Sequence, residues 1–190
     1  MPHIALPDDY PGIRSLFMYS PATALPLNHL VQTLLHDPET STLTPGEREL
    51  IAAYTSSLNT CKYCALTHSA IAQYQLGDKP TLVQQVINDP ETVDIPVKLK
   101  ALLKIAAKVQ QDGKRVVSSD IQFAKQQGAS DKEIHDAVLI ASAFCMYNRY
   151  VDGLATWTPD DPAIYDAIGK QRASEGYMSR PFVVTKQTSE

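Results

Sequence analysis

The chain has 190 residues, of which 44% are hydrophobic and 20% charged, a composition typical of one globular domain with a substantial core. Its net charge of −4 and pI near 5.7 argue against nucleic acid or an anionic membrane as partner. No stretch approaches the ~20 apolar residues of a membrane span, and the amino terminus lacks a secretory signal pattern, so we expect a cytoplasmic protein.

The predicted elements are helices almost throughout, delimited by apolar spacing, capping residues and Pro or Gly punctuation. One begins at the capping box Thr44-Pro45-Gly46-Glu47 and another at Ser130-Asp131-Lys132-Glu133. In chain order we expect helices at residues 24–36, 45–58, 60–76, 81–88, 96–111, 119–127 and 130–154. Strand alternation is nearly absent. The sequence therefore predicts an all-α bundle of helical hairpins in a single domain.

A weak internal similarity appears at an offset of 51 residues, where Pro45 matches Pro96 and Gly77 matches Gly128. It indicates either a duplicated helical hairpin or coincidence, since Pro at helix starts and Gly at helix ends are generic signals. The second copy has no equivalent of the cysteines and histidine described next. Any chemistry should therefore lie in the first copy.

The strongest chemical signal is NTCKYCALTHSA, residues 59–70, which contains Cys61, Cys64 and His68 as C-x-x-C-x-x-x-H. On a helix these side chains share one narrow stripe. Structural zinc usually takes two ligand pairs from separate elements, and no second pair follows, so we expect a metal-free site. A thioredoxin-like centre needs a βαβ setting, which this helical pattern lacks. The third cysteine, Cys145, is typical of a packing residue.

A redox centre is physically favoured for the Cys61 and Cys64 pair. Free N–H groups and the dipole at the first turn of a helix stabilise a thiolate, the reactive form of cysteine. His68, one turn beyond Cys64, can take its proton. Helical i,i+3 neighbours lie farther apart than a disulfide requires, so a bond between these cysteines would be strained and readily reduced.

Glu49 is the candidate partner of His68. If the helices at 45–58 and 60–76 form an antiparallel hairpin, both residues lie about nine positions from the turn and are therefore level. A carboxylate that orients a histidine facing a thiol is the logic of an activated nucleophile. The alternative is a solvated glutamate at a helix start. In the first case we expect Glu49→Gln to change the chemistry and leave folding nearly unaffected.

The segment from Glu49 to Ala72 resembles the core of the alkyl hydroperoxidase D (AhpD)-like, carboxymuconolactone decarboxylase superfamily. The redox branch of that superfamily has a Glu, a C-x-x-C twelve residues later and a His four residues after the second Cys. The segments ALLKIAAKVQ and GASDKEIHDAVLIASAFCMYNRYVDGL are similar to its peroxidase-related subgroup, with an N-R-x-x-D ending. The resemblance covers most of residues 40–154. It implies one oligomeric, AhpD-like domain over residues 1–190, with a core at about 24–157 and an extension at 158–190.

The resemblance implies an antioxidant thiol peroxidase, a dithiol–disulfide oxidoreductase acting on small hydroperoxides. Cys64 would attack the peroxide and become a sulfenic acid, and Cys61 would then form a disulfide with it, although the reverse order stays open. Glu49 and His68 would manage protons. No metal or organic cofactor is implied, but a lipoyl or thioredoxin-like protein would reopen the disulfide. One departure is Tyr63, which replaces a second histidine of the best-known relatives and is a poor proton relay at neutral pH.

Two other functions stay open. One is a non-redox relative that acts on a small lactone or keto acid, with incidental cysteines, and the other is a redox sensor without turnover.

Three further features of the chain carry structural expectations. Asn148, Arg149 and Asp152 favour a structural role, with Arg149 and Asp152 as an ordinary i,i+3 pair. The apolar segment 130–157 favours a homo-oligomer. The tail after Gly176, with Tyr177, Met178 and Phe182, would be an arm across a partner subunit.

Overall fold

The computed structural model describes residues 1–77 and 81–179. These residues form nine α-helices, two short 3-10 helices and no strand, which confirms the predicted all-α class. In chain order the elements are α1 (Ile13–Tyr19), α2 (Pro21–Leu35), η1 (Pro38–Thr40), α3 (Pro45–Leu58), α4 (Lys62–Leu76), α5 (Leu82–Asn88), α6 (Val97–Gln111), η2 (Gly113–Arg115), α7 (Ser118–Gln126), α8 (Asp131–Gly153) and α9 (Pro162–Glu175). No helix in this part of the chain is long and apolar enough to cross a membrane.

The helix starts show which local signals decided the boundaries. Both predicted capping boxes are formed, at Thr44 and at Ser130, where α3 and α8 begin. Helix α4 begins two residues later than the predicted start at residue 60, and its N-cap is Cys61. Thr60 has a φ of 59°, in the left-handed region, and therefore lies in the turn before the helix.

Two helices, α1 and α9, were not predicted. Helix α1 has only seven residues, too few for an apolar period to stand out. Helix α9 buries little besides Tyr165, Ile168, Gly169 and Arg172, so its inner face is not an apolar stripe. Its start nevertheless carries a local signal, since Asp161 caps it before Pro162 at the first helical position.

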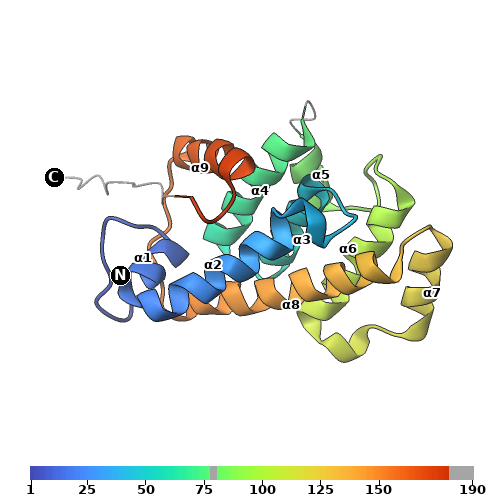
Figure 1. The fold of residues 1–190 in the computed structure, drawn as a ribbon, viewed down its shortest axis with the longest axis horizontal. Helices are drawn as coiled ribbons and strands as arrows, with labels where there is room; N and C mark the ends of the chain where they lie inside the picture. Colours follow the sequence, from blue (N-terminus) through green and yellow to red (C-terminus); the bar gives the residue numbers. More distant parts are fainter. Residues whose placement is uncertain (78–80, 180–190) are drawn as a thin grey trace.

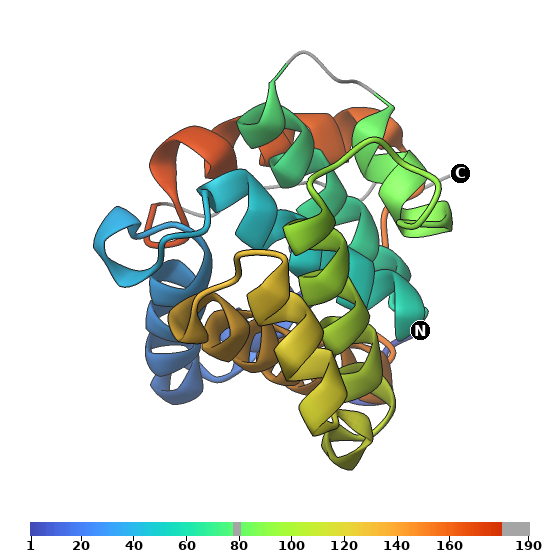
Figure 2. The ribbon, with the colours of Figure 1, turned by 90° about the vertical axis from the view of Figure 1, so that its right-hand side faces the viewer.

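The hairpin of α3 and α4 forms the centre of the molecule (Figure 1). Helix α4 packs between α3 and α9, and the long helix α8 packs against α3 on another side. Helix α6 lies beside α3 and α8, on the side of the molecule that faces the viewer in Figure 2. In the predicted duplication, α6 and α7 would correspond to α3 and α4. Helix α7 has nine residues and α4 has 15, so the two hairpins differ in length and the duplication stays a prediction.

The main core lies where α3, α4, α6 and α8 meet. Its fully buried side chains include Leu50, Ile51, Ile71, Leu102 and Ile140. Burying one such side chain contributes about 1.5–3 kcal/mol, so this core is the main reason that the hairpin is held in place. A second, smaller cluster contains Leu16, Cys61, Tyr63, Cys64, Val151 and Tyr165. The cysteine pair therefore belongs to an apolar region between α1, α4, α8 and α9.

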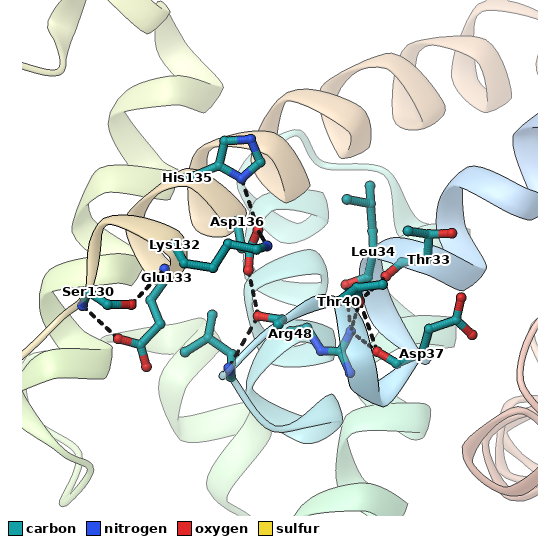
Figure 3. A network of polar contacts seen from close by, with 12 residues as sticks. Thr33, Leu34, Asp37, Thr40, Arg48, Ser130, Lys132, Glu133, His135 and Asp136 are labelled. Carbon is teal, nitrogen blue, oxygen red and sulfur yellow. Dashed lines mark hydrogen bonds and ion pairs between the residues drawn. The ribbon is translucent and has the colours of Figure 1, made fainter.

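A buried arginine attaches the start of α3 to the end of α2 (Figure 3). Arg48 is fully buried, and its Nη1 donates to the carbonyl oxygens of Leu34 at 3.2 Å and Asp37 at 3.0 Å. These carbonyls lie at or just beyond the end of α2, where a cation also interacts favourably with the helix dipole. Because Glu49 follows Arg48 directly, this anchor also holds the backbone of Glu49 in place.

Candidate active site

The cysteine pair lies at the start of α4, as predicted. Cys61 is the N-cap residue and is fully buried, whereas Cys64, in the first turn, is 5% exposed. Both thiols are free. Cys64 lines a cavity of about 60 Å³ whose lining does not include Cys61. Cys64 is therefore the cysteine that a small molecule in this cavity would meet first.

The environment of the Cys61 thiol disfavours its charged form. A hydrogen-bonding contact with Cys64, together with burial, raises the pKa of the Cys61 thiol far above its usual range. A contact with Asp152 acts in the same direction. Because the thiolate is the nucleophilic form, Cys61 is held in its unreactive, protonated form while Cys64 is reduced.

Glu49 and His68 are in direct contact across the α3–α4 hairpin. His68 Nδ1 lies 2.8 Å from Glu49 Oε2, and Glu49 has no exposed surface. The two residues therefore lie at the same height along the hairpin, as its geometry predicted. Because Glu49 is fully buried, the alternative of a solvated glutamate is excluded. If Nδ1 carries the proton donated to Glu49, Nε2 is the basic nitrogen of the ring. His68 lines the same cavity as Cys64, one helical turn further along α4.

Tyr177 completes a buried polar group with this pair. Its hydroxyl donates to Glu49 Oε1 and lies 3.2 Å from His68 Nδ1. Burial, and then the negative charge of Glu49, raise the pKa of Tyr177 well above its usual value. The hydroxyl is therefore a hydrogen-bond donor, not a base, throughout the physiological pH range.

The sequence interpretation missed Tyr177, which it assigned to an arm reaching a partner subunit. Tyr177 instead packs inside its own chain, and its backbone N–H donates to Gln32 Oε1 at 2.6 Å. Phe182, the other aromatic residue of the expected arm, lies outside the described residues. Tyr177 is 128 positions from Glu49 in the sequence, and no local motif marks it.

Tyr63, at the position of the second histidine of the relatives, also lines the cavity. Burial raises its pKa to about 12, so the hydroxyl is protonated at neutral pH, as the sequence interpretation required. The Tyr63 ring packs against Gly12, where a Cβ atom would be only 2.1 Å from the nearest ring atom. Gly12 also has a φ of 54°, a conformation that favours glycine.

The three residues of the N-R-x-x-D ending take separate structural roles. Asn148 is buried and bridges α8 to the end of α3, donating to Ser56 Oγ at 3.1 Å and accepting from Asn59 Nδ2 at 2.8 Å. Arg149 donates to the carbonyl of Cys145, one turn earlier on α8, and not to Asp152. The expected Arg149–Asp152 pair is therefore not formed in the described structure, and Asp152 enters only as a small influence that raises the pKa of the Cys61 thiol.

The cavity is mostly apolar. Apart from the cysteine, histidine and tyrosines, its lining comprises Pro11, Ile13, Arg14, Phe17, Asn28, Val31, Thr67, Phe144, Ile168 and Arg172. A second cavity of about 460 Å³ shares Arg14, Phe17, Asn28 and Tyr177 with the first. Across residues 1–77 and 81–179, no group of three or more His, Cys, Asp or Glu side chains could hold a metal ion.

Comparison with known proteins gives structural neighbours only, because no protein-family model and no curated protein matches the chain. One neighbour is an uncharacterized peroxidase-related protein from Ralstonia eutropha JMP134, described as an alkylhydroperoxidase AhpD core. It is 26% identical over 84% of this chain and 81% of that chain, with a TM-score of 0.74. The chain has the AhpD-like fold. This agreement confirms the resemblance inferred from the residues around the cysteine pair.

A second structural neighbour is also described as peroxidase-related. It is an uncharacterized peroxidase-related protein from Silicibacter sp. TM1040, 24% identical over 82% of this chain and 78% of that chain, with a TM-score of 0.72. At this identity the likeness concerns the fold alone. Both alignments include most of each chain, so the AhpD-like fold accounts for the greater part of the described molecule.

Proposed function

We propose that this AhpD-like protein is a thiol peroxidase that reduces an organic hydroperoxide with the Cys64 and Cys61 pair. The observation that carries the proposal is the buried Glu49–His68 contact beside a cavity lined by Cys64. A thiol that shares a cavity with an oriented histidine is the arrangement of an activated nucleophile. The peroxidase-related neighbours support the same reaction class.

In the first step Cys64 gives its proton to His68 and attacks the outer peroxide oxygen. An S–O bond forms as the O–O bond breaks, and the departing alkoxide takes the proton from His68 and leaves as the alcohol. Glu49 stabilises the imidazolium that exists between the two proton transfers. The products are a sulfenic acid at Cys64 and one molecule of alcohol.

In the second step the sulfur of Cys61 attacks the sulfenic sulfur of Cys64. The thiol proton and the hydroxyl group leave as water, and a disulfide joins the first turn of α4. A dithiol protein, lipoyl or thioredoxin-like, reduces this disulfide and is itself oxidised. We propose that the protein works as a homo-oligomer in the cytoplasm, where such reductants keep thiols reduced.

The test is continuous consumption of cumene hydroperoxide with dihydrolipoamide or reduced thioredoxin as donor. Cys64→Ser should abolish turnover, whereas Cys61→Ser should stop after one equivalent and leave a sulfenic acid that dimedone traps. Cys145→Ser is the matched control, since that thiol lies outside the cavity and contacts Asn59 Nδ2 at 3.6 Å. A single equivalent of peroxide consumed by the wild type with every donor would favour a sensor, and full turnover by Cys64→Ser would overturn the assignment.

A further inference from the structure

Arg14 places a positive charge on the wall of the candidate active site. It lies on α1 and is half-buried. It lines both the cavity of about 60 Å³ that contains Cys64, here called the inner cavity, and the cavity of about 460 Å³, here called the outer cavity. Its guanidinium lies 5.9 Å from the centre of the Phe17 ring, but it forms no hydrogen bond or ion pair with any described residue. Removing a charged group from water without a counter-ion is costly, and burial accordingly lowers the pKa of Arg14.

The neighbours of Arg14 do not supply the missing negative charge. The inner cavity lining contains no aspartate or glutamate. Tyr63 and Tyr177, which lie near Arg14, have raised pKa values and are neutral at physiological pH. A second cation, Arg172, lines the same cavity, and the charge of Arg14 adds to burial in lowering the pKa of Arg172 to about 10. The wall is therefore cationic.

A polar atom in the same lining also lacks a partner. The Oδ1 of Asn28 is buried and reaches no hydrogen-bond partner in the described part of the chain. Thr67, which is 8% exposed and lies one turn after Cys64 on α4, adds a hydroxyl to this lining. Buried polar groups are nearly always hydrogen-bonded in native proteins, so the Asn28 oxygen indicates a polar ligand in the cavity.

We infer that the substrate is an organic hydroperoxide that carries a carboxylate, an assignment that rests on the proposed peroxidase function. The planar fork of Arg14 binds the carboxylate, and the hydroperoxide group lies at Cys64, within reach of the Thr67 hydroxyl. The apolar side chains of Phe17 and Phe144 hold the carbon skeleton. Because the inner cavity holds only about 60 Å³, the carboxylate and the peroxide are separated by a short skeleton.

A matched pair of probes tests the charge alone: 4-hydroperoxy-4-methylpentanoate and its methyl ester. The wild type should reduce the acid with a kcat/KM about 10–100-fold above that of the ester, the typical size of a charge-assisted hydrogen bond. In Arg14→Gln this ratio should fall to near one, mainly through a higher KM for the acid, and Arg14→Lys should retain part of it. Lys62→Gln is the control, since Lys62 is a largely exposed cation paired with Asp160, and it should keep the ratio.

A second readout needs no turnover. The alcohol product, 4-hydroxy-4-methylpentanoate, should slow iodoacetamide alkylation of Cys64 in the wild type, but not in Arg14→Gln, and its methyl ester should protect neither. Equal reduction of both probes with no effect of Arg14→Gln would overturn the carboxylate assignment and leave the peroxidase standing. Reduction of neither probe would overturn the peroxidase proposal, and protection by the acid product would then still identify an Arg14-dependent carboxylate site.

Discussion

Replacing Glu49 by Gln removes the only negative charge in contact with His68 and Tyr177 in the described structure, while it keeps the size of the side chain. A carboxylate accepts hydrogen bonds at both oxygens, whereas an amide has one acceptor and one donor group. If the amide nitrogen faces His68 Nδ1, it donates to that atom and shifts the ring proton to Nε2. The imidazole then has no free basic nitrogen for the Cys64 proton.

We expect Glu49→Gln to lower the turnover rate strongly and the free energy of unfolding moderately. Removing one positioned proton-transfer group costs about 10²–10⁴ in rate, equivalent to about 3–5 kcal/mol of activation free energy. The sequence-based expectation was that folding would be nearly unaffected, but Glu49 is fully buried and accepts two hydrogen bonds, so we now expect a loss of stability as well. Exchanging charged for neutral hydrogen bonds should lower the free energy of unfolding by about 1–2 kcal/mol, or the Tm by about 2–8 °C.

The assay combines peroxide turnover, the rate of Cys64 alkylation between pH 5 and pH 10, and thermal melts. In Glu49→Gln the alkylation profile should move to higher pH as turnover falls. Glu47→Gln is the matched control on the same helix, since Glu47 serves the capping box, where its Oε2 accepts from Thr44 N at 2.8 Å. It should cost a few tenths of a kcal/mol and leave turnover unchanged. A folded Glu49→Gln protein with wild-type turnover and pH profile would refute the reasoning.

Three further predictions concern the surroundings of the site. Tyr177→Phe should lower the free energy of unfolding by about 1–2 kcal/mol and slow turnover, because the buried carboxylate loses a donor; unchanged melts and turnover would contradict this. Gly12→Ala should destabilise the protein by about 1–3 kcal/mol in urea unfolding, since φ is 54° and a Cβ would meet the Tyr63 ring; a wild-type midpoint would argue against it. Light scattering should give a homo-oligomer, consistent with exposed Leu139 and Met146 on α8, and a monomer at micromolar concentration would rule it out.

The sequence by itself determined the features that depend on neighbours along one helix or one hairpin. The capping boxes at Thr44 and Ser130 set the starts of α3 and α8, because their hydrogen bonds are local. The contact between Glu49 and His68 was predictable for the same reason, since a short turn makes residues equally distant from it level.

Only the tertiary structure decided which side chains enclose the site. Tyr177 and Arg14 reach the cavity from segments far from the cysteine motif, and no periodicity or spacing relates them to it. The different access of Cys61 and Cys64 also arose from packing, because both lie at the start of α4 but only Cys64 lines the cavity. Burial and charge at a point in space depend on all the elements that meet there, and a linear pattern encodes only those contributed by its own helix.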